Sequence, residues 1–428
     1  MNGPARAVSQ RRGACPGLSA PMPTGDGLLV RLIPTGTIAL SVFAEFCAAA
    51  RKHGNGVIEI TSRGSIQIRG LNPASAPRFA AHVAALGIAA EDGVSVLCNA
   101  LAGLDAEEIL DAGALAADLR HALTRERFAA RLAAKVSIAV DGGGALGLES
   151  VAADIRLIAE AIDGGAMLRV SVGGDAAGAT PLGCVAPAHG VEAATRLLEV
   201  LAKRGRDARA RNIIATDGTA AFRSAIAGLL TMDTPRPARR SADAIGLHPL
   251  RDGLLACGIG LAFGHADAIS LERLIDAAAV AGAHGLRAAA GRALMIIGLM
   301  PERSSAFAAS AEELGFIVRA GDPRRHVVAC AGAPICAFAH IAARAMAPRI
   351  AEIAAHRLAG AFTIHISGCA KGCARAAPAA LTVVGTPEGC ALIANGTAHD
   401  AAFAVVPTNE LPAAIAKYAR EHREAGHV

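Results

Sequence analysis

Residues 27–71 read GLLVRLIPTGTIALSVFAEFCAAARKHGNGVIEITSRGSIQIRGL. An apolar run opens this stretch, an amphipathic segment with helical spacing follows, and two segments with alternating Ile residues close it. These patterns predict a strand, a helix and two further strands. This order of elements corresponds to half of a ferredoxin-like unit.

The same pattern recurs in the second half of the chain. Residues 252–255 read DGLL, as residues 26–29 do, and the Gly-Leu pair at 298–299 repeats the pair at 70–71 after a helix of similar length. We therefore expect an internally duplicated α+β protein, in which a longer α/β domain follows each ferredoxin-like half unit. The expected parts are an N-terminal extension (1–20), a first half unit (21–86), a first α/β domain (87–230), a linker rich in Pro and Arg (231–244), a second half unit (245–300) and a second α/β domain (301–428).

The composition indicates a globular protein rather than a membrane or nucleic-acid-binding one. Charged residues make up 18% of the 428 residues, and the formal charge of +5 is too small to indicate nucleic-acid binding. No stretch approaches the roughly twenty consecutive apolar residues of a membrane span. The opening residues MNGPARAVSQRRG lack the apolar segment of a secretory signal, so we expect a cytoplasmic protein with reduced cysteines.

Four of the ten cysteines form two spaced pairs in the last quarter of the chain. Cys330 and Cys336 stand in VACAGAPICAFAH, and Cys369 and Cys373 stand in HISGCAKGCAR. Four thiolates are the usual ligand set of a 4Fe-4S cluster. Glycines beside both pairs favour turns, and the apolar residues 335–346 predict a helix whose N-terminal amides would face the anionic cluster. We therefore predict that these four cysteines hold a 4Fe-4S cluster.

Two other interpretations of the four cysteines stay open at this point. Reduced cysteines are often simply buried in a core. A structural zinc ion also takes four cysteines, but its pairs usually stand about two to four residues apart, and C-x5-C falls outside that range. The other cysteines show no repeated spacing, and we interpret them as structural: Cys15, Cys47, Cys98, Cys184, Cys257 and Cys390.

C-x5-C followed by G-C-x-x-G-C-x-R resembles the cluster signature of the sulfite and nitrite reductase family. The duplicated half units are similar to the pseudo-twofold halves of that family, so the resemblance covers nearly the whole chain. Three segments resemble the branch of the family that oxidises a precorrin in aerobic cobalamin biosynthesis: RGACPGLSAPMPTGDGLLVRL (12–32), LAGLD (101–105) and HISGCAKGCAR.

The resemblance implies a monooxygenase that converts precorrin-3A to precorrin-3B with dioxygen, hydroxylating the macrocycle and closing a lactone. It also implies a mononuclear non-haem iron besides the cluster. The sequence shows no 2-His-1-carboxylate spacing for that iron, and only His326, His340 and His365 stand near the cysteines. No dinucleotide-binding glycine motif is present, so electrons from NADH are expected to enter through a separate reductase.

Four basic residues are candidates for holding the carboxylates of the tetrapyrrole, because they match positions where the family places such residues. Arg31 matches an arginine of the opening strand, and Arg63 and Arg69 match arginines in the strand ITSRGSIQIRG. Lys135 matches the first of two active-site lysines of the reductases. An arginine fork binds a carboxylate through two hydrogen bonds and stays charged at every working pH, which suits this role.

Two departures from the reductases favour the macrocycle rather than a small anion as the substrate. Ser137 stands where the second lysine is expected, and Val94 stands where an arginine is expected. A sulfite or nitrite reductase with sirohaem would need both cations to hold its anion, and it is the alternative enzyme. A protein that only carries electrons or binds a tetrapyrrole is the alternative from another class.

Overall fold

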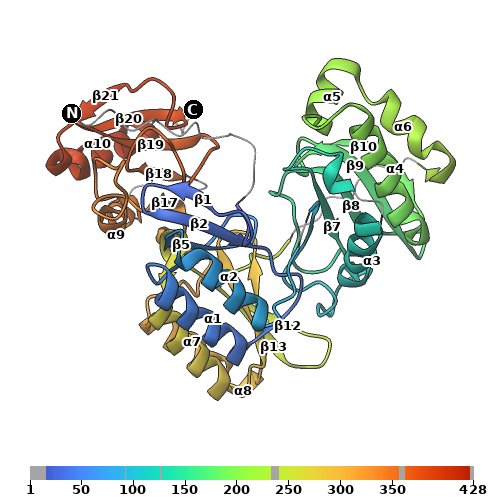
Figure 1. Ribbon diagram of the computed structural model, residues 1–428, viewed down its shortest axis with the longest axis horizontal. Coiled ribbons are helices and arrows are strands. Elements are labelled where there is room, and N and C mark those ends of the chain that lie inside the picture. Colours follow the sequence, from blue (N-terminus) through green and yellow to red (C-terminus); the bar gives the residue numbers. More distant parts are fainter. Residues whose placement is uncertain (1–15, 92, 126–127, 233–240, 356–361, 425–428) are drawn as a thin grey trace. The chain divides into compact units, whose positions relative to one another are not determined.

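The computed structural model describes residues 16–91, 93–125, 128–232, 241–355 and 362–424. The chain divides into two compact units (Figure 1), one of residues 1–17 and 90–242 and one of residues 18–89 and 243–428. The second unit contains both predicted half units and the two cysteine pairs. Of the expected linker, residues 231–232 belong to a strand and residues 233–240 lie outside the described residues, as do residues 1–15 with Cys15.

The first half unit forms a five-stranded sheet with the strand order β1-β2-β5-β4-β14. The predicted strand, helix and two strands of residues 27–71 are confirmed, and a short extra strand precedes the helix. The elements of this half unit are β1 (Met22–Thr24), β2 (Gly27–Leu32), β3 (Ile38–Ala39), α1 (Leu40–His53), β4 (Val57–Ile60), β5 (Ile66–Leu71) and α2 (Ser75–Ala85).

The second half unit repeats this arrangement in a sheet with the order β12-β13-β16-β15-β3. The two half units exchange a strand, because β14 pairs with β4 and β3 pairs with β15. Each sheet is thus completed by the other half unit, and the two form one body. The elements of the second half unit are β12 (Gly246–Pro249), β13 (Leu255–Gly260), β14 (His265–Asp267), α7 (Ala268–Val280), β15 (Gly285–Ala289), β16 (Ala293–Leu299) and α8 (Pro301–Glu313).

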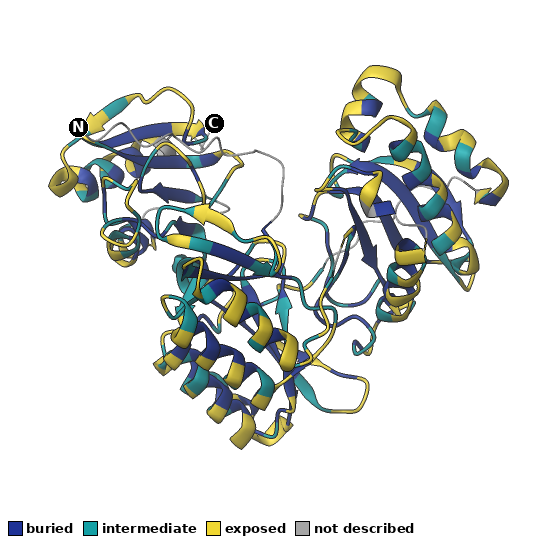
Figure 2. Cartoon of the chain, in the orientation of Figure 1, coloured by how far each residue is buried: buried dark blue, intermediate teal, exposed yellow. Residues whose placement is uncertain are grey.

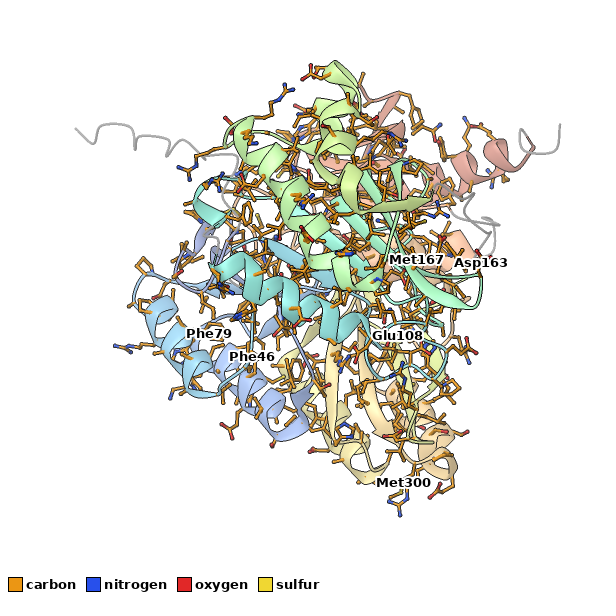
Figure 3. All side chains as sticks on the ribbon, turned by 90° about the vertical axis from the view of Figure 1, so that its right-hand side faces the viewer. Phe46, Phe79, Glu108, Asp163, Met167 and Met300 are labelled. Carbon is orange, nitrogen blue, oxygen red and sulfur yellow. The ribbon has the colours of Figure 1, made fainter. Side chains whose placement is uncertain are left out.

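The helices of the two half units share one apolar core with the two sheets. Helical spacing places Phe43, Phe46, Cys47 and Ala50 on the buried face of α1. Phe46 lies edge-on to Phe79 of α2, with the ring centroids 5.8 Å apart (Figure 3). Figure 2 shows the resulting pattern, in which the strands are largely buried and the outer faces of the helices are exposed.

The C-terminal α/β domain is built on a sheet with the order β17-β18-β19-β20-β21. The first three strands run parallel, and the pairs β19-β20 and β20-β21 are antiparallel. Residues of α9 and α10 share an apolar core with this sheet. The elements are β17 (Val327–Ala329), α9 (Ala343–Ala355), β18 (Ile364–Ser367), β19 (Ala379–Thr386), β20 (Gly389–Gly396), β21 (Ala404–Val406) and α10 (Leu411–Glu424).

The other unit contains the corresponding first α/β domain, with the sheet order β11-β10-β9-β8-β7-β6. Its strands β6, β7 and β8 are parallel and the rest antiparallel, as in the C-terminal domain, so the predicted duplicated α+β fold is confirmed. None of the described helices is long and apolar enough to cross a membrane. The elements are β6 (Ser95–Cys98), α3 (Ala112–Arg125), β7 (Ser137–Asp141), β8 (Ala153–Ile162), β9 (Gly165–Gly174), β10 (Thr180–Val185), α4 (Gly190–Lys203), α5 (Ala210–Asp217), α6 (Ala220–Ile226) and β11 (Leu230–Met232).

Candidate functional site

The two cysteine pairs lie at one edge of the C-terminal sheet. Cys330 follows β17 directly, and Cys369 stands shortly after β18. Because β17 and β18 are parallel neighbours, their carboxyl ends meet at the same edge. Cys336 and Cys373 belong to the loops that continue from these two ends. The fold therefore brings the predicted ligands together from two separate segments.

Hydrogen bonds hold the two cysteine loops against each other. The N–H of Gly368 donates to Sγ of Cys330 at 3.0 Å. The N–H of His340 donates to the carbonyl of Gly368 at 2.8 Å, and the N–H of Cys336 donates to the carbonyl of Gly332, also at 2.8 Å. Gly332 has a φ of 67°, a left-handed conformation that glycine adopts most readily. Each loop therefore fixes the path of the other.

The segment after Cys336 differs from the prediction. The predicted helix over residues 335–346 begins too early, because α9 begins only at Ala343. Two N–H groups of this segment donate to carbonyls far away in the sequence, that of Ala337 to Gly25 at 2.9 Å and that of His340 to Gly368 at 2.8 Å. A helix needs its backbone groups for bonds within itself, so these tertiary bonds exclude it here. No helix N-terminus follows Cys336 directly in this described segment.

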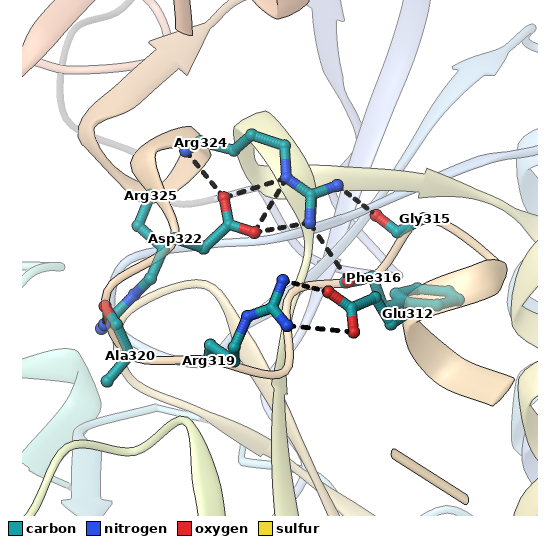
Figure 4. Close-up of polar contacts among 8 residues, drawn as sticks. All are labelled: Glu312, Gly315, Phe316, Arg319, Ala320, Asp322, Arg324 and Arg325. Carbon is teal, nitrogen blue, oxygen red and sulfur yellow. Dashed lines mark hydrogen bonds and ion pairs between the residues drawn. The ribbon is translucent and has the colours of Figure 1, made fainter. Parts of the chain in front are cut away.

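A polar network fixes the chain just before β17 and Cys330 (Figure 4). Asp322 accepts a hydrogen bond from the backbone N–H of Arg324 at 2.9 Å, and its carboxylate also binds the Arg324 guanidinium. The same guanidinium donates to the carbonyls of Gly315 and Phe316 at 2.8 and 3.3 Å. These contacts tie the turn that leads into β17 to the end of α8, which sets the direction in which the chain reaches Cys330.

The four thiols influence one another electrostatically. Burial raises the pKa of Cys330, and Cys369 and Cys336 raise it further, against hydrogen bonds from two backbone N–H groups. Loss of solvent contact at the thiol raises the pKa of Cys373, and Cys330 and Cys369 add to this, whereas Arg69 lowers it. Among the described residues, no three His, Cys, Asp or Glu side chains lie close enough to hold a single metal ion. That the four cysteines hold a 4Fe-4S cluster stays a prediction, which rests on their paired spacing and on the hydrogen bonds between their loops.

The mononuclear iron implied by the resemblance finds no ligand set in the described part of the chain. His365 is fully buried in β18, and neither ring nitrogen has a hydrogen-bond partner among the described residues. Burial, together with the charges of Arg375 and Arg292, lowers the pKa of His365 to about 4. His326 and His340 belong to no group of three possible ligands either. The described residues therefore do not fit such an iron.

A pocket of about 220 Å³ adjoins the cysteines. Cys330 and Cys373 form part of its wall, together with Arg31, Arg69 and Arg292. The pocket lies wholly within the unit of residues 18–89 and 243–428. Two of the predicted basic residues therefore face the same pocket as two of the predicted cluster ligands.

Acidic side chains already engage the guanidinium of Arg69. Its Nε and Nη2 each donate to Asp26 at 2.8 Å, and its Nη1 lies 3.5 Å from Glu59. The pair is buried, with 10% of the Arg69 side chain and 2% of the Asp26 side chain exposed. Burial raises the pKa of Asp26, but the hydrogen bonds and charge of Arg69 outweigh this and hold it below its usual value. Arg69 thus has a fixed internal partner.

The other predicted basic residues have different surroundings. Arg31 lines the pocket and donates to the side-chain oxygen of Gln67, at 3.0 Å from Nε, when the amide is in its favourable orientation. Arg63 is exposed on a turn, where its backbone forms a bridge with Ala290. Lys135 is exposed just before β7, in the other unit. Arg63 is therefore not part of the pocket wall. Lys135 belongs to the unit that contains residues 90–242, whereas the pocket belongs to the other unit.

Several residues of the site were missed by the sequence analysis. Asp26 and Glu59 neutralise Arg69, and Glu59 also pairs with Arg344. His265 of β14 has a buried Nδ1 without a partner among the described residues, and burial together with Arg344 lowers its pKa to about 4. No motif marks these positions, because an acid that faces an arginine inside a sheet has no characteristic spacing. The repeated Asp-Gly at 26 and 252 was the one available signal.

Two family models match the chain. Residues 20–86 match the nitrite/sulfite reductase ferredoxin-like half domain, and residues 90–231 match the nitrite and sulphite reductase 4Fe-4S domain. Residues 90–231 contain only Cys98 and Cys184, which are too few to hold a four-cysteine cluster. The paired cysteines of the C-terminal domain are therefore the candidate ligands.

Among the relatives, a precorrin-3B synthase of Sinorhizobium sp. is 39% identical over 424 residues, which cover 98% of this chain and 91% of the relative. This chain belongs to the precorrin-3B synthase family. The chain is also similar to reductases, of which a sulfite reductase (ferredoxin) 2 of Mycolicibacterium paratuberculosis is 24% identical over 74% of this chain and 62% of its own length. A ferredoxin–nitrite reductase of Synechococcus elongatus is 26% identical over 82% of this chain and 75% of its own. The solved Mycobacterium tuberculosis NirA protein has the same fold, with a TM-score of 0.73 at 20% identity over 92% of this chain and 80% of that one.

Membership of the precorrin-3B synthase family agrees with the two positions at which this chain lacks a cation. Ser137 is buried at the start of β7, and its N–H donates to Asp154 at 3.2 Å. Val94 is buried just before β6. Neither side chain offers a positive charge to a small oxyanion.

Proposed function

We propose that this protein converts precorrin-3A to precorrin-3B, hydroxylating the macrocycle and closing a lactone from one of its acetate side chains. The observation that carries the proposal is the 39% identity to the Sinorhizobium precorrin-3B synthase along 98% of the chain. The pocket supports it, because cationic side chains and two cluster thiols share one wall. A macrocycle fringed with carboxylates needs this combination of positive charge and an adjoining source of electrons.

The cysteines and the arginines of the site have different roles. A 4Fe-4S cluster held by Cys330, Cys336, Cys369 and Cys373 would supply electrons one at a time. Arg31 and Arg69 both lie in the pocket wall, where Asp26 and Glu59 offset much of the charge of Arg69. The internal acids that bind Arg69 hold its guanidinium in a single orientation, so its field at the pocket is fixed before substrate binds.

We further propose that dioxygen is the oxidant. In a monooxygenase one oxygen atom enters the macrocycle and the other leaves as water, which requires two electrons and two protons from a donor. Since no dinucleotide-binding motif is present in the sequence, the donor is a separate NADH-dependent reductase. Turnover of the purified chain with NADH alone would contradict this.

The experiment is an anaerobic purification with optical and EPR spectra and a count of iron and sulfide per chain. Precorrin-3A, a chemical reductant and ¹⁸O-labelled dioxygen are then added, and the product is analysed by mass spectrometry. A 4Fe-4S signal and one labelled oxygen in the product are the expected results. Iron beyond that of one cluster would indicate the additional mononuclear iron.

Other outcomes select the alternatives. Sirohaem absorption bands together with reduction of sulfite or nitrite would establish an anion reductase. A cluster without conversion of the macrocycle, in the presence of a competent electron donor, would indicate an electron carrier or a tetrapyrrole-binding protein. Absence of iron and sulfide after anaerobic purification would overturn the assignment of the cysteines.

A further inference from the structure

The positive charges around the pocket differ in their internal partners. Arg69 is bound by Asp26 through two hydrogen bonds, and Glu59 lies between Arg69 and Arg344. These arginines are therefore largely neutralised within the protein. A bound carboxylate would compete there with carboxylates that are already in place.

Arg292 lines the same pocket without an acidic partner. No Asp or Glu forms an ion pair with it in the described part of the chain, and its guanidinium donates only to the carbonyl of Ala374, at 3.4 Å. Loss of solvent contact, with the charge of Arg375, lowers its pKa. A partly buried cation without a counter-charge favours an anion beside it.

The backbone holds Arg292 in an unusual conformation. Its φ is 65°, in the left-handed region that residues with a β-carbon rarely adopt, at the turn between β15 and β16. The side chain crosses Gly264 so closely that a β-carbon there would lie 2.9 Å from Cδ of Arg292. Both features direct one guanidinium towards the loop that carries Cys373, since Ala374 is the next residue. Strained backbone of this kind persists where the surrounding structure demands it and is frequent at ligand sites.

The group around Arg292 contains further donors and no acid. His365 and Arg375 lie near enough to Arg292 for their charges to interact. The ring nitrogens of His365 have no partner among the described residues. The guanidinium of Arg375 donates to the carbonyl of Pro378 and has no ion pair with a described acid. Neither His365 nor Arg375 lines the pocket, so Arg292 is the residue through which this group can meet an anion there.

We propose that Arg292 is the residue that anchors a carboxylate of the tetrapyrrole in this pocket, an inference that rests on the proposed function. The anchored carboxylate would lie beside Cys373, one of the two predicted cluster ligands in the pocket wall, so the macrocycle would be held next to the cluster. Arg69 lies in the same wall, but Asp26 already binds its guanidinium. Arg292 thereby decides the orientation of the substrate rather than the supply of electrons.

The test compares Arg292→Asn with Arg287→Asn. Asn tolerates the left-handed conformation, so the first variant removes the guanidinium without new backbone strain. Arg287 stands on β15 of the same hairpin, bonds to Thr37 at 2.8 Å and does not line the pocket, which makes it the matched control. Binding of precorrin-3A is followed anaerobically by its absorbance change, so that no turnover is needed.

We expect Arg292→Asn to weaken binding roughly tenfold to hundredfold, the range for one charge-assisted hydrogen-bonded contact, and Arg287→Asn to leave it unchanged. Esterifying the substrate carboxylates should bring the wild-type and Arg292→Asn dissociation constants together. Iron content and circular dichroism check the fold, and Arg292→Gly, which the backbone also favours, replaces the Asn variant if that one loses its cluster. Equal dissociation constants for the wild type and a folded Arg292 variant would overturn the role of Arg292 but leave the proposed function standing. Failure of the wild type to bind precorrin-3A would instead overturn the proposed function.

Discussion

Gly25 lies so close to Cys336 that any side chain there should disturb the cluster. A β-carbon at Gly25 would stand 2.3 Å from Sγ of Cys336 and 2.8 Å from Cδ2 of Phe338. Non-bonded heavy atoms prefer about 3.5–4.0 Å, so the thiol or the turn must move by roughly 1.2 Å or more. Metal–thiolate distances tolerate only about 0.2 Å, and we therefore expect Gly25→Ala to retain less than about half of the wild-type iron. Gly36→Ala is the matched control, because nothing lies within 4 Å of a β-carbon there.

The assay is the iron and sulfide content per chain after anaerobic purification, with the optical spectrum of the cluster and circular dichroism of the fold. The expected result is a folded Gly25→Ala protein with depleted iron, beside a Gly36→Ala protein that matches the wild type. A Gly25→Ala protein with full iron and an unchanged spectrum would refute the argument. It would mean that Gly25 and Cys336 are far enough apart in solution to accommodate a β-carbon between them.

Three further predictions concern single side chains. Cys373→Ser should lose the cluster and the associated activity, whereas Cys390→Ala, which removes a buried thiol outside the two pairs, should keep the cluster; equal iron contents would contradict the assignment. Asp26→Asn should lower the free energy of unfolding by roughly 3 kcal/mol in a denaturant titration, because it leaves Arg69 buried without its bidentate partner; a change well below about 1 kcal/mol would show that the pair is not buried in solution. Burial holds the pKa of His265 at about 4, below the value of 6.5 in an unfolded chain, so its contribution to stability is complete above pH 6.5 and is lost as the pH falls towards 4. Between about pH 7.5 and about pH 5.5 this amounts to about 1 kcal/mol, which His265→Gln should lack; parallel pH profiles of the two proteins would contradict the shift.

The sequence analysis succeeded where the signal is local. The alternating and helical patterns of residues 27–71 predicted β2, α1, β4 and β5, and the repeated DGLL revealed the duplication. The start of the helix expected after Cys336 was wrong because the N–H groups of Ala337 and His340 donate to distant carbonyls, and apolar periodicity does not report such bonds. The exchange of β3 and β14 between the half units was likewise invisible, since strands of two or three residues carry almost no pattern.

The sequence by itself determined the fold class and the duplication and predicted the four cysteine ligands, because periodicity, repeated motifs and paired spacing can be read from the order of residues alone. Only the tertiary structure decided which acidic and basic side chains form ion pairs. Arg31 and Arg69 were equivalent candidates in sequence, yet packing gives Arg69 a buried acidic partner in Asp26 and leaves Arg292 without one. Gly25 and Cys336 are far apart in the sequence and in contact in the fold. Electrostatic and steric energies depend on distance in space, which a linear sequence of residues does not contain.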